Sequence, residues 1–373
     1  MTLIYLILIF ILSLIFCSTI LRKFFEKDHG NRNHVLDAFR GILAPLVFLH
    51  HFILTLHWKS TGAWGFPENK LVSNLGSIPV SFFFMITGYL FLRKVTTQDI
   101  SWRDLAVNRI LRIYPLYLSF LFLAYLSYFY LYAGESPYYG IATSLKESLS
   151  FIIKPVNGFN LGRILGGVQW TLVYETIFYF SLPTLYIILN RKISSVSILC
   201  SIPFYLVLWY YEKNTFIINN LFFLFPIGAA CFYLSKNKIT KHLKSRVAGI
   251  LVIISILTSF IATESYSAIQ FALMGFVFLC VSSQNNILGI LKAKGLLALG
   301  DISYSIYLIH GIILYYTFSV IEIQKIIPKN ELYMYSVFPL LMVSVVAISC
   351  ATYKLIEVPS IAVSHKIRNR YFK

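Results

Sequence analysis

Long apolar runs separated by short polar segments make up most of the chain. An α-helix rises 1.5 Å per residue, so about 20 apolar residues cross a hydrocarbon core of roughly 30 Å. Eleven runs approach this length, and we expect each to be a membrane span. They cover residues 2–21, 35–57, 75–95, 112–133, 165–190, 195–212, 216–234, 247–263, 265–283, 296–320 and 332–357.

The composition agrees with this pattern. Of 373 residues, 58% are hydrophobic and 13% are charged, whereas soluble domains carry about 25% charged residues. A soluble fold of this length could not bury so much apolar surface. The composition excludes a soluble enzyme, a disordered chain and a secreted disulfide scaffold, and it predicts an all-α polytopic integral membrane protein. The five cysteines include no CxxC pair, so they indicate neither disulfides nor a metal site.

Lysine and arginine residues are concentrated in alternate connecting segments. Of the 32, 23 fall in one alternating set of segments and 8 in the other, and Arg40 lies inside a span. Cytoplasmic loops of membrane proteins are enriched in these residues. The bias predicts an N-terminus outside, a basic cytoplasmic tail at 361–373 and a long outside loop at 134–164. No nucleic-acid partner is expected for the net charge of +17, because no contiguous basic domain is present.

Ionisable residues inside a span are costly and are therefore functional candidates. In the second span, Asp37, Arg40 and His51 share one stripe of the helix, and His50 lies about 80° away from it. His51 lies roughly 16 Å beyond Arg40 along the axis. A structural role is the alternative, in which Arg40 reaches the interface and the histidines bond to neighbouring helices. A metal site at His50, His51 and His57 is disfavoured, because no Cys or carboxylate lies at ligand spacing.

A second cluster is basic. Arg109 and Arg112 are three residues apart, on one helical face at the cytoplasmic start of a span, and Tyr114 follows them. Two guanidinium groups in this position suit the phosphates of a ligand. The alternative is a plain anchor that obeys the positive-inside rule.

Two further segments place polar residues deep in the membrane. Glu175 lies about ten residues, or ~15 Å, inside its span, and a buried carboxylate needs a partner or a proton. His51 lies about six residues from the same outer face, so the two could meet, and a carboxylate commonly orients a histidine general base. A structural ion pair with another cation of the bundle is the alternative. The segment 300–310 brings His310 to mid-membrane, where packing and function are both possible.

Taken in order, these segments resemble the membrane-bound acyltransferase family 3, the sugar O-acetyltransferases, over residues 35–360. Six short pieces carry the resemblance. They are Leu36-Asp37-Ala38-Phe39-Arg40-Gly41 followed by His51, Phe82 to Leu90, the RxxR segment Arg109 to Pro115, Trp170 to Glu175 with Thr171 in a serine position, Ser303 to His310, and Glu357-Val358-Pro359. The helix at 2–21 departs from the family pattern, because it precedes the usual start.

The resemblance implies a core of about ten helices at 35–360, preceded by an extra helix and a cytoplasmic loop at 1–34. It also implies acetyl-CoA as the usual donor and a catalytic role for the histidine, and it does not supply an acceptor. For the acceptor we expect a glycan or glycolipid, and we expect a multi-pass location in the plasma (bacterial inner) membrane among its lipids and no metal. We therefore expect an O-acetyltransferase. The expected site consists of catalytic His51 and Glu175, acetyl-CoA-binding Arg40, Arg109, Arg112 and Tyr114, and supporting Asp37, Trp170, Ser303, Tyr304 and His310.

Two other classes of function stay open. A proton-coupled exporter of a sugar or lipid-linked glycan could use Asp37, Arg40, His51 and Glu175 as a proton relay. Such transporters often show related halves with broken helices, and the sequence shows no internal repeat. A scaffold or receptor without chemistry would leave the intramembrane charges unexplained.

Overall fold

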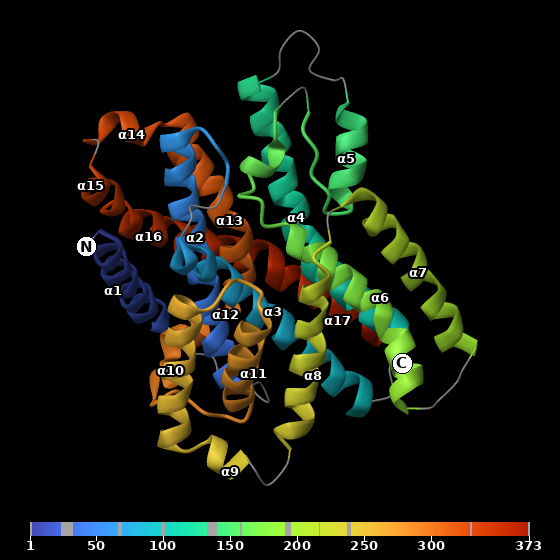
Figure 1. The fold of residues 1–373 in the computed structure, drawn as a ribbon. Coiled ribbons are helices and arrows are strands. Elements are labelled where there is room, and N and C mark those ends of the chain that lie inside the picture. The colour runs from blue at the N-terminus through green and yellow to red at the C-terminus, as the bar shows by residue number, and fades with distance from the viewer. Residues whose placement is uncertain are drawn as a thin grey trace. The chain divides into compact units, whose positions relative to one another are not determined.

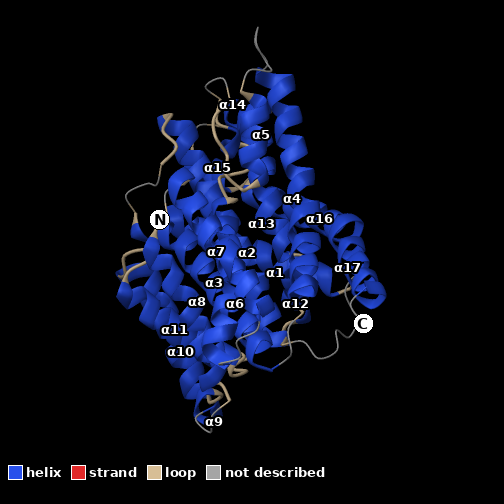
Figure 2. Ribbon diagram, turned by 90° about the vertical axis from the view of Figure 1, so that its right-hand side faces the viewer, coloured by secondary structure: helices blue, strands red, loops and turns tan. Residues whose placement is uncertain are grey.

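The computed structural model is built from helices. It describes residues 2–23, 33–65, 69–97, 101–132, 140–156, 159–190, 195–215, 217–236, 240–328 and 330–371. Within these ranges the only β-type pairing is an isolated bridge between Val156 and Phe159, and Figure 2 shows helices and loops. The all-α fold predicted from the sequence is confirmed.

The chain divides into two compact units, of which the first comprises Met1–Gly88 and Phe223–Cys350. Its helices (Figure 1) are α1 (Thr2–Arg22), α2 (His34–Thr61), most of α3 (Lys70–Thr97), α8 (Leu224–Leu234), α9 (Thr240–Leu243), α10 (Arg246–Ala262), α11 (Ala268–Ser282), η3 (Ile290–Lys292), α12 (Lys294–Asp301), α13 (Ser303–Tyr315), η4 (Tyr316–Val320), α14 (Ile323–Ile326), α15 (Glu331–Tyr335) and most of α16 (Phe338–Thr352). Both α12 and α13 pack against α2, and α10 packs against α11.

The second unit comprises Tyr89–Phe222 and Ala351–Lys373. It contains the end of α3 and the helices α4 (Trp102–Tyr132), α5 (Ile141–Leu149), η1 (Leu161–Arg163), α6 (Trp170–Asn190), α7 (Ser195–Asn214), η2 (Asn219–Phe223), η5 (Tyr353–Glu357) and α17 (Val358–Tyr371). Helix α6 packs against α7, and α17 packs against α4.

Six helices of the described residues are long and apolar enough to cross a membrane, or seven if α12 and the α13–η4 helix, which are bent by 68°, form one broken span. All eleven expected runs are helical, but some are too short for a full span. Helices α10 and α11 have 17 and 15 residues, or about 25 and 22 Å. Serine side chains cap both, since Ser245 accepts from the amide of Ala248 and Ser267 from that of Gln270.

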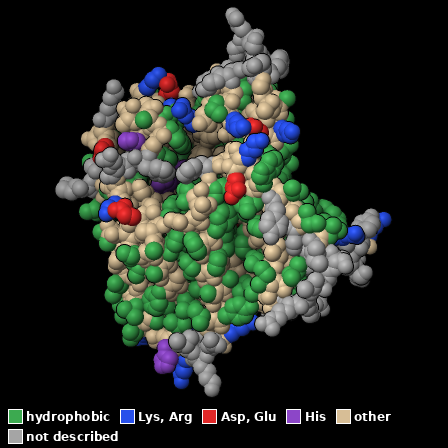
Figure 3. Space-filling view, turned by 45° about the vertical axis from the view of Figure 1, so that its right-hand side comes forward, with side chains coloured by type: hydrophobic (Ala, Val, Ile, Leu, Met, Phe, Trp, Pro, Cys, Tyr) green, Lys and Arg blue, Asp and Glu red, His purple; other side chains and the backbone are tan. Residues whose placement is uncertain are grey.

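Exposed apolar side chains form stripes on several helices. On α7, the side chains of Leu199, Ile202, Leu206 and Trp209 are 53–67% exposed and recur at helical spacing. A helix in water would bury such a stripe, whereas a helix in a bilayer turns it toward lipid. On the face drawn in Figure 3, most of the exposed side chains are hydrophobic. The protein is a multi-pass membrane protein.

Glycine residues allow α2 and α12 to approach to backbone contact. A methyl group on Gly41 would overlap the carbonyl oxygen of Leu296, and one on Gly300 would overlap the carbonyl oxygen of Asp37. Small residues at crossing points are a usual means of close helix packing in membranes. This reciprocal crossing fixes α12 against α2, and α13 continues from α12.

The N-terminal helix α1 belongs to the first unit. The side chains of Leu6, Phe10 and Cys17 are buried, and Gly295 of α12 lies against the backbone of Ser18. Helix α1 therefore covers the outer side of α12, which gives a packing role to the helix that departs from the family pattern.

Asn74 on α3 is a fully buried polar hub. Its side-chain amide donates to the carbonyl oxygens of Ser259, Phe260 and Thr263 at 2.9–3.1 Å. Its Oδ1 accepts from the side chains of Ser77, Ser265 and Gln270 at 2.9–3.2 Å. These bonds satisfy carbonyl groups left open where α10 ends, and they fasten the α10–α11 turn to α3.

Replacement of Asn74 by leucine is expected to destabilise the protein by about 2–4 kcal/mol, because it leaves several buried polar groups without partners. Thermal unfolding of the purified protein in detergent measures the loss. Lys70→Met is the matched control, since it removes an ion pair with Glu264 near the same turn whose side chains are 55% and 68% exposed. Equal melting temperatures for Asn74→Leu and the wild type would contradict the structural role.

Candidate active site

His51 and His310 face each other in the first unit. Their ring centroids are 4.9 Å apart, and the planes are inclined by 46°. His310 on α13 is fully buried, whereas His51 on α2 is partly exposed. The rings of Phe48 and Tyr307 lie 5.9 and 6.2 Å from that of His310. The pair of histidines thus sits on an apolar, aromatic wall.

Hydrogen bonds to the backbone fix the tautomer of both rings. The Nδ1 of His51 lies 2.9 Å from the carbonyl oxygen of Val47, and the Nδ1 of His310 lies 2.9 Å from that of Ile306. A carbonyl oxygen only accepts, so each Nδ1 carries the hydrogen and each neutral Nε2 presents a lone pair. The Nε2 of His310 is buried and has no hydrogen-bond partner. Two basic nitrogens are therefore held in neighbouring rings.

His50 points to a different neighbour. Its Nδ1 bonds to the carbonyl oxygen of Val72 on α3 at 2.8 Å. The ring packs on α3 so closely that a methyl group on Gly76 would stand 2.8 Å from it. His50 therefore tethers α2 to α3, on another side of the helix from the contact between His51 and His310, as the helical wheel predicts.

Asp37 and Arg40 form an ion pair about three to four turns before His51. The closest nitrogen and oxygen are 3.7 Å apart, and the side chains are 22% and 18% exposed. Because Gly300 packs on the Asp37 backbone, the pair lies beside the α2–α12 crossing. Arg40 has further interactions, so its charge is held in a network.

Arg109 and Glu175 belong to a cluster in the second unit. The Arg109 guanidinium lies 4.6 Å from the ring centroid of Phe91 and 5.7 Å from that of Tyr179. The Tyr179 hydroxyl donates to Glu175 Oε2 at 2.5 Å. Arg109 is thus a cation packed between aromatic rings, and Tyr179 links it to the carboxylate. The expected pairing of His51 with Glu175 joins residues of the two units and stays a prediction.

The remaining expected residues have varied surroundings. Arg112 is exposed on α4, while the Tyr114 hydroxyl donates to the carbonyl oxygen of Leu149 at 3.1 Å. Trp170 starts α6 and lies edge-on to the ring of Tyr174. At the start of α13, Ser303 is buried with an unpartnered hydroxyl and Tyr304 is half-buried. Within the described residues, no three His, Cys, Asp or Glu side chains are arranged to hold a metal ion.

A comparison with protein families shows the family of the chain. The model of the acyltransferase domain family Acyl_transf_3 matches residues 33–354. The chain belongs to this family. No curated protein and no solved structure matches the chain. The family covers both units and every expected site residue, and it makes the protein a membrane acyltransferase.

Three residues that contact the candidate residues were missed by sequence reasoning. They are Phe91 and Tyr179, which surround Arg109, and Tyr307, which lies beside His310. Tyr179 follows Glu175 by four residues, so the helical spacing could have indicated their hydrogen bond. Tyr307 precedes His310 by three residues on the same helix and carried the same signal. Nothing in the sequence pairs Phe91 with Arg109, because they lie on different helices.

Proposed function

We propose that this acyltransferase moves an acetyl group from cytoplasmic acetyl-CoA to a hydroxyl group of a cell-surface or lipid-linked glycan. The observation that carries the proposal is the arrangement of His51 and His310 inside a family-matched bundle. An ester-forming transfer needs a base for the hydroxyl proton. The His51 Nε2 offers a lone pair for it, and His51 is the more exposed member of the pair.

One histidine suffices for both proton transfers of the proposed reaction. The His51 Nε2 takes the hydroxyl proton while the sugar oxygen attacks the thioester carbonyl. The C–S bond then breaks, and the CoA thiolate leaves with the proton that His51 returns. Glu175 is proposed as the carboxylate that stabilises the intervening imidazolium. Positioned proton transfer of this kind typically contributes 10²–10⁴-fold to a rate.

The arginines are the proposed contacts of acetyl-CoA. Arg112 is exposed and can offer its fork to phosphate oxygens. Arg109 is packed on Phe91 and Tyr179. Its positive charge lies close in the helix to that of Arg112 and supports the same phosphate-binding role. Tyr114 closes this part of the proposed site, and Arg40 lies along the route of the pantetheine arm toward His51. The charge bias supports a cytoplasmic position for Arg109 and Arg112, whereas Tyr114 bonds to Leu149 at the end of α5.

Purified protein in sealed liposomes tests the function. Acetyl-CoA labelled in the acetyl group is enclosed in the liposomes, and the host's surface polysaccharide, from which esters have been removed by mild alkali, is supplied on the other side of the membrane. The expected result is label in an alkali-labile ester on the polysaccharide. Unmodified glycan that crosses the liposome membrane, without labelled ester, would instead favour the exporter.

Replacement of His310 by asparagine is expected to lower kcat about 10–100-fold and to leave the KM for acetyl-CoA within about twofold. Asparagine can keep the donor to the Ile306 carbonyl but removes the Nε2 lone pair beside His51. Steady-state kinetics over a range of pH measure the change. His242→Asn on α9 is the control, since His242 is exposed and distant in the sequence from every site residue. Unchanged kcat for His310→Asn would leave His310 with a packing role only.

A further inference from the structure

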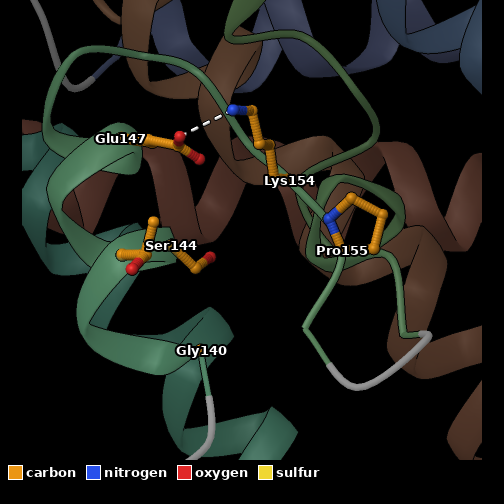
Figure 4. A pocket seen from close by; sticks show the side chains of 6 residues that line it. Gly140, Ser144, Glu147, Lys154 and Pro155 are labelled. Carbon is orange, nitrogen blue, oxygen red and sulfur yellow. Dashed lines mark hydrogen bonds and ion pairs between the residues drawn. The ribbon is translucent and has the colours of Figure 1, made fainter.

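A polar pocket opens beside α5 in the second unit. It has a volume of about 430 Å³ and is lined by Gly140, Thr143, Ser144, Glu147, Lys154 and Pro155. Figure 4 shows Glu147 on α5 and Lys154 on the following segment reaching toward each other across it, with Ser144 one turn earlier on the helix. A volume of this size is typical of small-ligand sites. Four of the six lining residues carry a hydroxyl, carboxylate or ammonium group.

One carboxylate oxygen of Glu147 has a hydrogen-bond partner, and the other has none. Its Oε1 accepts from the Lys154 Nζ at 2.6 Å. Its Oε2 is buried and lacks a hydrogen-bond partner. A buried carboxylate oxygen has lost its hydration and requires a donor. A hydroxyl group of a ligand in the pocket would be such a donor.

Lys154 complements this acceptor. Its side chain is 47% exposed, and an ammonium group has three donors, of which the contact with Glu147 uses one. Thr143 adds an exposed hydroxyl at the rim. Carboxylate and ammonium cancel each other's charge, so the pocket does not favour an anion such as phosphate. Adjacent acceptors and donors without net charge suit the vicinal hydroxyl groups of a neutral sugar.

Tyrosine hydroxyls hold the helix that carries Glu147 in place. Tyr117 donates to the carbonyl oxygen of Ser148 at 2.6 Å, Tyr114 to that of Leu149 at 3.1 Å, and Tyr211 to that of Ser150 at 3.0 Å. Carbonyl groups at a helix C-terminus lack intrahelical partners, and these hydroxyls supply them. Tyr125 also bonds to the Ser144 hydroxyl at 2.9 Å. The pocket wall is therefore preorganised, which lowers the entropy lost on binding.

We infer that this pocket is a binding subsite for a neutral, polyhydroxylated sugar unit of the acceptor. This inference rests on the proposed function, which is what makes the sugar an acceptor of the acyl group. It also rests on the Lys and Arg bias, which predicts that the segment 134–164 lies outside. Tyr138 and Tyr139, two aromatic candidates of this loop, lie outside the described residues. Phe159, the third candidate, packs on Tyr128 with ring centroids 6.1 Å apart. We therefore assign the contacts with the sugar to Glu147 and Lys154.

Binding of the de-esterified host polysaccharide to the purified protein in nanodiscs tests the subsite by calorimetry. We expect Glu147→Gln and Lys154→Met each to raise Kd and the acceptor KM about tenfold, as expected for the loss of a charge-assisted hydrogen bond. The kcat and the KM for acetyl-CoA should not change. Thr143→Val leaves the ion pair intact and should weaken binding a few-fold, so a local folding defect cannot explain its effect. Lys146→Met, exposed on α5 but outside the pocket, is the matched control and should bind as the wild type.

Two results would overturn the subsite: a wild-type protein that does not bind the polysaccharide, or Glu147 and Lys154 variants that bind it as the wild type does. The same experiment separates this inference from the proposed function. If binding depends on Glu147 and Lys154 but no labelled ester forms, the subsite stands and acetyl transfer falls. If ester forms equally with all variants, the function stands and the subsite falls.

Discussion

The His51→Ala variant is expected to lose at least 10²-fold, and up to about 10⁴-fold, of the acetyl transfer rate. The variant lacks the proposed base for the hydroxyl proton, and His310 cannot replace it, because His310 is fully buried. The ester content of the host's surface polysaccharide, measured by NMR in strains that carry the wild type or the variant, reports the loss. Protein amounts in the membrane fraction are compared in parallel, since alanine also removes the bond to Val47.

His50→Ala is the matched control for this experiment. It removes the neighbouring imidazole and the hydrogen bond to Val72, which we expect to cost about 1–3 kcal/mol of stability. The rate per folded molecule should stay within a few-fold of the wild type, because the His50 ring bonds to Val72 on α3 and only its edge-on packing against His51, at 5.0 Å between centroids, is lost near the proposed base. A fully active His51→Ala variant would remove His51 from the catalytic role. Equal loss of rate for both variants would contradict the distinct role assigned to His51, whose ring lies edge-on to that of His50 with centroids 5.0 Å apart.

The helices of the bundle could be predicted because their signal is local. The apolar run 35–57 corresponds to α2, which Asn33 caps at the start by accepting from the Leu36 amide and Gly62 ends in a left-handed conformation. The separate directions of His50 and His51 also follow from helical geometry alone. Span number was less predictable: α10 and α11 are apolar but short, and apolarity does not fix where a capped helix ends.

The contacts between helices were not predictable from one sequence. A wheel shows which side of α2 carries His51, but not that His310 lies against that side. Arg109 illustrates the same limit, since its position at the start of a span favoured a phosphate contact but gave no sign that the guanidinium packs on Phe91 and Tyr179. Such contacts depend on how closely two backbones approach. That approach is set by small residues whose partners are remote in the chain.

The second large effect is expected from a substitution at the crossing of α2 and α12. Gly41→Ala is expected to destabilise the protein by about 3 kcal/mol or more and to lower the rate of the remaining folded protein about 100-fold. Alanine normally stabilises a helix relative to glycine by about 1 kcal/mol, so the predicted sign is reversed. The cause is backbone contact: the new methyl group would overlap the carbonyl oxygen of Leu296 and stand 2.9 Å from the amide nitrogen of Gly300.

The loss of rate follows from the path of the chain. Helix α13 continues from α12, so a displacement of α12 from α2 also moves His310 away from His51. Gly275→Ala on α11 is the control, because its methyl group would meet only the side chain of Ile227, at 3.2 Å; we expect stability within about 1 kcal/mol of the wild type. Thermal unfolding and acetyl transfer measured on both variants give the comparison. Gly41→Ala with wild-type stability and rate would show that the close crossing does not hold the two histidines together.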